Sequence, residues 1–223
     1  MPELPDPVER AVEAVKPRLR GASHFYAFFV SIPLGIALVV AAPTGKATLA
    51  AAIYALAVSG LLITSGLYHR IDWRRPRARA WMRRLDHSMI FVLIAGTYTP
   101  FSLLVLDGTL ATAVLIAVWA GALGGIVLNL VWITAPKWVT ATVYVTLGWV
   151  AVIAMPELAE RLGAAGVALL IGGGLLYTAG AVIYAAQRPN PAPAVFGYHE
   201  IFHALVVAAA AAHFAVVAFY ALP

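Results

Sequence analysis

The chain has 223 residues, of which 62% are hydrophobic and 11% are charged, and its formal net charge is +5. A soluble domain carries about 25% charged residues, so the composition excludes a soluble enzyme or a nucleic-acid-binding domain as the bulk of the molecule. The absence of cysteine excludes both a disulfide framework and a thiolate metal site.

Residues 1–22 are expected to form a cytoplasmic tail ahead of the membrane domain. The tail begins with the acidic, Pro-rich stretch MPELPDPVER, which has none of the features of a signal peptide. Between residues 5 and 20, four apolar residues recur at helical spacing. This pattern indicates an amphipathic helix on the inner membrane surface. Because Pro17 interrupts its end, a partly ordered tail is the alternative.

Residues 23–223 are predicted to form an all-α domain that crosses a membrane seven times. A spanning helix needs about 20 predominantly apolar residues, and runs of this length recur between Pro, Gly and charged residues. The expected spans are about 24–42, 47–68, 86–106, 109–131, 138–155, 163–184 and 199–221. The connections are short, which leaves no room for a sizeable soluble domain.

The distribution of Lys and Arg predicts the orientation of these spans. Of the 15 Lys and Arg residues, only Lys46 and Arg161 fall on one side of the predicted membrane, and the rest fall on the other. Positive residues concentrate in cytoplasmic loops, so the N-terminus is expected inside and the C-terminus outside. The loop 70–84, RIDWRRPRARAWMRR, contributes most to this bias. It is either a topology determinant alone or also a binding site for anionic headgroups.

Ionisable side chains inside membrane spans are costly and often mark function. The candidates here are His24, His69, Asp86, His87, His199, Glu200, His203 and His213. His69 ends the second span and Asp86 opens the third. His199 and His203 open the seventh span. The predicted topology therefore brings three imidazoles and a carboxylate to one level, at the cytoplasmic side.

Three of these histidines are candidate metal ligands. His199 and His203 are spaced i, i+4 and share a helix face, and His69 would complete a set of three. Three histidines and a water molecule form a catalytic zinc site, although other transition metals also accept histidine. Asp86 would orient or deprotonate the water, or bind as a fourth ligand. Ser65, one turn before His69, would donate a hydrogen bond to the substrate or the water.

The remaining histidines are expected to be structural. A lone histidine in a membrane span usually forms a hydrogen bond between helices, and this is the role expected of His24 and His213. His87 adjoins Asp86 but points about 100° away from it on a helix. We expect His87 to pack at a helix interface and to bind no metal.

The stretch HEIFH (199–203) also matches H-E-x-x-H, in which the glutamate of a zinc protease acts as general base. An intramembrane protease needs a further acidic ligand, and Asp107 in LDG (106–108) is the candidate. The third span is about 30 Å long at 1.5 Å per residue, which places Asp107 on the outer side, away from His199. The protease interpretation is therefore not favoured, and Glu200 is not expected to be an essential base.

Three blocks of the sequence resemble the signature blocks of the progestin and adipoQ receptor family, and in particular its bacterial hemolysin III branch. They are SGLYH (65–69), LDHSMIFVLIAGTYTP (85–100) and HEIFHALVVAAAAAHF (199–214).

The resemblance implies a function as well as an architecture. It implies seven spans with the N-terminus inside, and a Zn²⁺ ion on His69, His199 and His203 with Asp86 and Ser65 beside the bound water. It implies kinship with alkaline ceramidases and hence hydrolysis of a lipid amide. It also implies a place in the bacterial inner membrane and a link to membrane lipid homeostasis.

Three functions remain open from the sequence. The first is a zinc-dependent hydrolase of a lipid amide or ester, with fatty acid or ceramide-like lipids as partners. The second is a sensor or receptor of lipid or membrane state in which zinc is structural. The third is a pore or transporter, which is not favoured because the charged groups lie at one face of the predicted membrane and form no continuous path across it. No protein partner is predicted.

Overall fold

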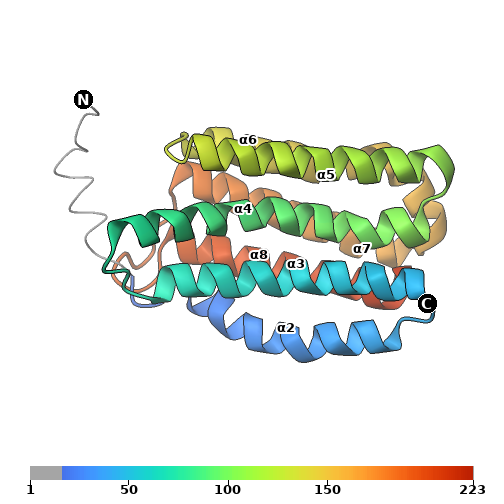
Figure 1. Ribbon diagram of the computed structural model, residues 1–223, viewed down its shortest axis with the longest axis horizontal. Helices are drawn as coiled ribbons and strands as arrows, with labels where there is room; N and C mark the ends of the chain where they lie inside the picture. The colour runs from blue at the N-terminus through green and yellow to red at the C-terminus, as the bar shows by residue number, and fades with distance from the viewer. Residues whose placement is uncertain (1–16, 223) are drawn as a thin grey trace.

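The computed structural model describes residues 17–222 as a bundle of helices that run along one common axis (Figure 1). In chain order the helices are α2 (Ala22–Ala41), α3 (Gly45–Arg70), α4 (Pro76–Pro100), η1 (Phe101–Val105), α5 (Gly108–Val131), α6 (Lys137–Gly148), α7 (Ala151–Ala186), α8 (Tyr198–Val216) and η2 (Val217–Ala221). The π-helical segments η1 and η2 continue α4 and α8. Within residues 17–222 the β pairing is limited to one isolated bridge, so the predicted all-α class is confirmed.

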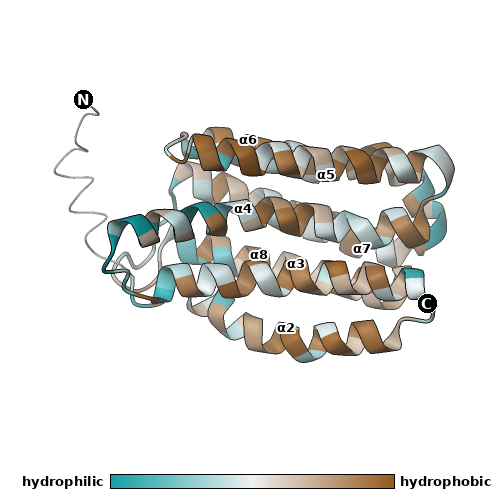
Figure 2. Ribbon diagram, viewed as in Figure 1, coloured by the Kyte–Doolittle hydropathy of each residue, from teal (hydrophilic) through white to brown (hydrophobic). Residues whose placement is uncertain are grey.

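Six helical stretches in the described part of the chain are long and apolar enough to cross a membrane. Large apolar side chains such as Val40, Leu56 and Val131 are exposed on the helices, as expected of surfaces that contact lipid. Hydrophilic residues gather at the end of the bundle where α3 connects to α4 (Figure 2). The first 16 residues, with most of the predicted amphipathic tail, lie outside the described part.

One of the six stretches, Lys137–Ala186, contains both α6 and α7, which pack against each other. The sequence predicts two spans here, 138–155 and 163–184. The structure places interruptions after Gly148 and at Gly163, whose φ of 65° is left-handed and outside the helical range. Glycine adopts this conformation without the steric cost that a Cβ imposes.

The predicted loop 70–84 is wrong in extent, because much of it is helical. Helix α4 begins at Pro76 and not near residue 86. Proline is favourable at a first helical position, where the N–H that it lacks would have no partner. The following residues include Ala, Arg, Met and Leu, all of them good helix formers. The apolar run that marks the span stops at the charged residues before residue 86, whereas helix α4 extends through them to Pro76.

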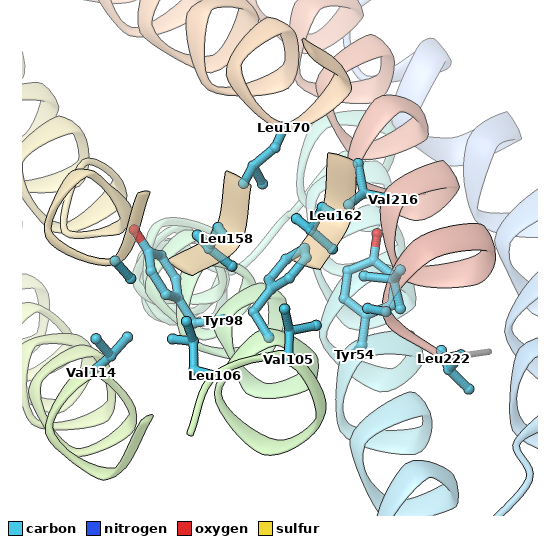
Figure 3. Packing of buried hydrophobic residues seen from close by; sticks show 14 of the residues in the cluster. Tyr54, Tyr98, Val105, Leu106, Val114, Leu158, Leu162, Leu170, Val216 and Leu222 are labelled. Carbon is cyan, nitrogen blue, oxygen red and sulfur yellow. The ribbon is translucent and has the colours of Figure 1, made fainter. Parts of the chain in front are cut away.

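The largest core cluster fills the end of the bundle away from the α3–α4 connection (Figure 3). Tyr54, Leu158, Leu162 and Val216 bring side chains of α3, α7 and α8 together there. The other end of the bundle is more polar, because it holds the buried side chains of His24, His69 and His203.

Candidate metal centre

Three histidines from two helices converge at the end of the bundle where α3 finishes and α8 starts. His69 lies in the last turn of α3, and His199 and His203 lie in the first turns of α8. One ring nitrogen from each lies within 4.8 Å of the others. The Nε2 atoms of His69 and His199 are 3.2 Å apart. The structure therefore brings together the three residues that the sequence selects as ligands.

The spacing of the ring nitrogens fits one tetrahedral metal ion. Zinc–nitrogen bonds of 2.0–2.1 Å in tetrahedral geometry place two ligand atoms roughly 3.3 Å apart, close to the distance between the rings of His69 and His199. A hydrogen bond between those two rings would fit the same distance but would leave His203 unused. The Nδ1 atom of His203 is buried and has no hydrogen-bond partner within residues 17–222. A shared ion engages all three rings, so the cluster could hold a transition metal.

Asp86 and Ser65 lie beside this cluster. Oδ2 of Asp86, on α4, is 3.6 Å from Nε2 of His69, and the Asp86 carboxylate forms a hydrogen bond with the side chain of Ser65. Ser65 is buried one turn before His69 on α3. A carboxylate in this place can accept a proton from a water molecule at the cluster, and the hydroxyl fixes its orientation.

Glu200 has two structural partners that its place in H-E-x-x-H does not reveal. Its Oε2 accepts a hydrogen bond from the backbone N–H of Gly197 at 2.7 Å, which caps the N-terminus of α8. Its Oε1 accepts one from Nε of Arg20 at 2.5 Å. The side chain is buried, with 3% exposed. One carboxylate oxygen therefore caps α8, and the other holds the start of α8 to the segment before α2.

Asp107, the candidate for the additional acidic ligand of a zinc protease, lies far from the histidine cluster. Asp107 lies just beyond η1, and the rest of α4 and all of η1 separate it from Asp86. It forms an ion pair with Arg161 on α7, and its backbone N–H donates to Glu157 at 2.8 Å. The group of candidate ligands within residues 17–222 does not include Asp107.

His24 takes a place that the sequence does not predict. The expected helix–helix contact is present, because the His24 side chain on α2 interacts with the backbone of His203 on α8, although neither ring nitrogen has a hydrogen bond of full geometry within residues 17–222. The ring of His24 also stacks on that of His203, which the sequence does not predict, with centroids 3.9 Å apart and planes 12° from parallel. Gly21 and Gly66 let the start of α2 pack closely against α3, since a Cβ on Gly21 would lie 2.5 Å from His69 and a Cβ on Gly66 would lie 3.0 Å from Phe25. In the sequence, the two glycines are the features that indicate close packing of the helices near His24.

His87 and His213 follow the expectations for structural histidines. The ring of His87 lies within hydrogen-bonding distance of the Arg83 carbonyl and the Tyr184 hydroxyl, at 2.7 and 3.3 Å. Nε2 of His213 lies 3.1 Å from the carbonyl oxygen of Leu170 on α7. The predicted helix–helix hydrogen bond of His213 is confirmed.

An apolar cavity leads from the cluster into the bundle. Its lining includes Ser65 and Asp86 near the cluster and Trp149 and His213 deeper in, and its volume is about 130 Å³. That is far more space than one water molecule requires. A second cavity of about 60 Å³ shares Trp149 and His213 with the first and lies towards the main core cluster. Two of the three candidate ligands, His199 and His203, thus face a mostly apolar cavity.

Comparison with known proteins gives the family. Residues 12–214 match the family model described as "Haemolysin-III related". The chain belongs to the haemolysin-III-related family. It is 33% identical to "Hemolysin-3" of Bacillus cereus over 224 residues, which is 99% of each chain. It is 35% identical to the "Hemolysin-3 homolog" of Bacillus subtilis, with 89% of this chain and 91% of that one aligned.

A more distant relative in this comparison is human. The "Monocyte to macrophage differentiation factor" of Homo sapiens is 27% identical over 165 residues, which covers 73% of this chain and 66% of that protein. The family membership confirms the resemblance found in the three sequence blocks. Together with the six apolar helical stretches, it identifies this haemolysin-III-related chain as an integral membrane protein.

Proposed function

We propose that this haemolysin-III-related protein binds zinc through His69, His199 and His203 and hydrolyses an amide or ester bond of a membrane lipid. One observation carries the proposal. A set of three candidate ligands and a carboxylate meet at the end of an apolar cavity inside a membrane protein. The cavity accepts an acyl chain, so fatty acid or ceramide-like lipids are the expected partners.

The same proposal includes seven membrane crossings, with the N-terminus in the cytoplasm and the C-terminus outside. The break at Gly163 and the packing of α6 against α7 support two crossings within Lys137–Ala186. Nζ of Lys137 donates to the hydroxyl of Tyr198 at 2.9 Å, which places the start of α6 beside the start of α8. The Bacillus relatives support a location in the bacterial inner, or plasma, membrane.

The chemistry of the site follows from its side chains. Zn²⁺, when bound, supplies a Lewis acid for the scissile carbonyl group. Asp86 accepts the proton of the attacking water and returns it to the leaving group. Ser65 orients the Asp86 carboxylate through their hydrogen bond. The lipid tail fills the cavity and keeps bulk water away from the reacting bond, which strengthens these electrostatic interactions.

A second candidate function is a lipid or membrane-state sensor with structural zinc. The observation that favours it is that the cluster joins α3 to α8, close to the ion pair between Arg20 and Glu200. A metal ion would then clamp the helices, and lipid in the cavity would shift their packing. This function requires no turnover.

Metal content and lipid hydrolysis of the purified protein test the proposal. The wild type is expected to carry one zinc ion per chain, and His203→Ala is expected to lose it. His87→Ala is the control, since His87 is the neighbour of Asp86 but lies outside the cluster. Asp86→Asn is expected to keep zinc and lose hydrolysis of ceramides and other acyl lipids. The proton acceptor is then removed while the ligands remain.

The results separate the alternatives. Equal zinc in the wild type and His203→Ala rules out the metal centre. Full turnover by Asp86→Asn removes Asp86 from the mechanism. Zinc binding without turnover of any acyl lipid, together with a melting temperature that falls on chelation, favours the sensor.

A further inference from the structure

The deep part of the cavity contains a second polar site, well away from the metal centre. His213 lines both cavities, and it lies ten residues after His203 on α8. At 1.5 Å per residue this separation is about 15 Å along the helix. Much of the surrounding lining is apolar, so a polar group at this depth needs a reason.

The hydrogen bond of His213 determines what its other nitrogen can do. Nε2 lies 3.1 Å from the carbonyl oxygen of Leu170. A carbonyl only accepts hydrogen bonds, so Nε2 carries the proton. In the neutral imidazole Nδ1 is then an acceptor. The Nδ1 atom of His213 is buried and has no hydrogen-bond partner within residues 17–222. The whole side chain is only 8% exposed.

Tyr177 provides a second unsatisfied group at the same place. Its ring lies against that of His213, with centroids 5.5 Å apart, and both residues line the larger cavity. The Tyr177 hydroxyl is also buried without a hydrogen-bond partner in the described part of the chain. Buried polar groups in proteins are almost always hydrogen-bonded. Two such groups side by side in a cavity therefore indicate a ligand.

The helices are shaped to hold His213 in this position. Gly173 on α7 faces its ring, and a Cβ there would lie 2.4 Å from the imidazole. The neighbouring glycines Gly172 and Gly174 meet nothing within 4 Å. Only the glycine opposite His213 is required for close approach, so the position of the imidazole depends on a specific feature of α7.

We infer that the lipid in the cavity carries a hydroxyl group partway along its hydrocarbon chain, and that His213 and Tyr177 bind this hydroxyl. The hydroxyl donates to Nδ1 of His213 and accepts from the hydroxyl of Tyr177. A ketone or an ester carbonyl cannot donate, so neither satisfies Nδ1. The ligand class is a hydroxylated acyl lipid, with its head group at the metal centre and its hydroxyl about 15 Å away.

The inference rests on the part of the proposed function that places a lipid in the cavity, and not on hydrolysis. The test is binding of stearic acid and of hydroxystearic acid with the hydroxyl at mid-chain to the purified, zinc-loaded protein, measured by calorimetry. The wild type is expected to bind the hydroxylated acid roughly tenfold more tightly, the effect of one or two net hydrogen bonds. Stearic acid hydroxylated beside its carboxyl group is expected to gain nothing.

Tyr177→Phe removes only a hydroxyl that has no partner in the described chain, so the fold is expected to persist. This variant and His213→Leu are expected to reduce the preference for the mid-chain hydroxyl while binding of stearic acid remains. Tyr54→Phe is the control, because the Tyr54 hydroxyl donates to Ala210 on α8 and does not line the cavity. It is expected to keep the full preference.

The outcomes distinguish this inference from the proposed function. Equal binding of the two acids by the wild type overturns the inference alone, as does a preference that both cavity variants retain. Water filling the space beside His213 would give the first of these results. If neither acid binds, both the inference and the presence of lipid in the cavity are wrong. Hydrolysis of lipids is measured separately and decides the reaction.

Discussion

The role of Glu200 is decided at the scale of single atoms. Its two carboxylate oxygens accept from Gly197 and Arg20. We predict that Glu200→Gln keeps zinc and activity and loses about 1.5–3 kcal/mol of stability, the contribution of a charged hydrogen bond. Glu200→Ala is expected to lose more, because it also removes the cap of α8. Thermal unfolding with metal analysis of each variant measures both effects.

A catalytic base would give a different pattern. Glu200→Gln would then abolish turnover without changing the melting temperature. Arg20→Gln is the matched control, since it removes the same ion pair from the other partner. If Glu200 is structural, the two glutamine variants lose similar stability and keep the same activity.

His24 is predicted to support His203 by stacking and to bind no metal. His24→Phe preserves a flat ring against His203 and is expected to retain the zinc content of the wild type. His24→Ala is expected to lose about 2–5 kcal/mol of stability, the range for truncating a buried side chain of comparable size. Zinc titration and chemical unfolding of both variants check this. Loss of zinc in His24→Phe at unchanged stability would show that His24 is a ligand.

The sequence predicts the candidate ligands better than the residues that pack against them. Helical spacing alone places His199 and His203 on one face, and the position of His69 at a span end gives its depth. The stacking of His24 on His203 could not be predicted in this way. It depends on how closely α2 approaches α8, and that distance follows from side-chain packing and not from periodicity.

At the scale of helices, glycine contacts determine how closely neighbours approach. A Cβ on Gly125 of α5 would lie 2.2 Å from the ring of Phe91 on α4, whereas Gly124 meets nothing within 4 Å. We predict that Gly125→Ala destabilises the protein by about 1–3 kcal/mol through overpacking. Gly124→Ala is expected to be neutral or to gain up to about 1 kcal/mol, since alanine favours helix.

Thermal unfolding of the two alanine variants in one detergent gives the comparison. Phe91 is fully buried, with 0% exposed, so its ring has little room to move away from a new methyl group. Equal stability of the two variants would mean that α4 and α5 do not meet as the structure places them.

In this chain the apolar runs predict where the helices lie, whereas capping residues, prolines and backbone conformation determine where each helix begins and ends. Thr44 caps α3 by accepting a hydrogen bond from the backbone N–H of Ala47 at 3.1 Å, and the predicted start at 47 is close to the observed start at Gly45. The start of α4 is missed, because hydropathy does not register Pro76 and the charged first turns. The interruption at Gly163 is a backbone conformation, which residue type permits but does not dictate.

At the scale of the whole molecule, the number of crossings determines which ends share a side of the membrane. Because the chain has no cysteine, single cysteines report topology directly. With seven crossings, Glu160→Cys near Gly163 lies outside and reacts with a membrane-impermeant maleimide in intact cells. Arg77→Cys and Arg188→Cys lie in the cytoplasm and react only after permeabilisation. All three positions are exposed, so burial within the protein does not limit labelling.

The alternative predicts a different result at two positions. With a single crossing of Lys137–Ala186, Arg188 would lie outside, and Arg188→Cys would react in intact cells. If Lys137–Ala186 crossed the membrane once, Glu160 would lie near the middle of that stretch, inside the bilayer, and would stay unlabelled in intact cells. A helix of 50 residues is about 75 Å long at 1.5 Å per residue, more than twice the hydrocarbon thickness of about 30 Å. A single crossing would also place a charged carboxylate and the neighbouring Arg161 in lipid, at several kcal/mol each. Labelling of Glu160→Cys in intact cells is therefore expected, and labelling only after permeabilisation would contradict the proposed seven crossings.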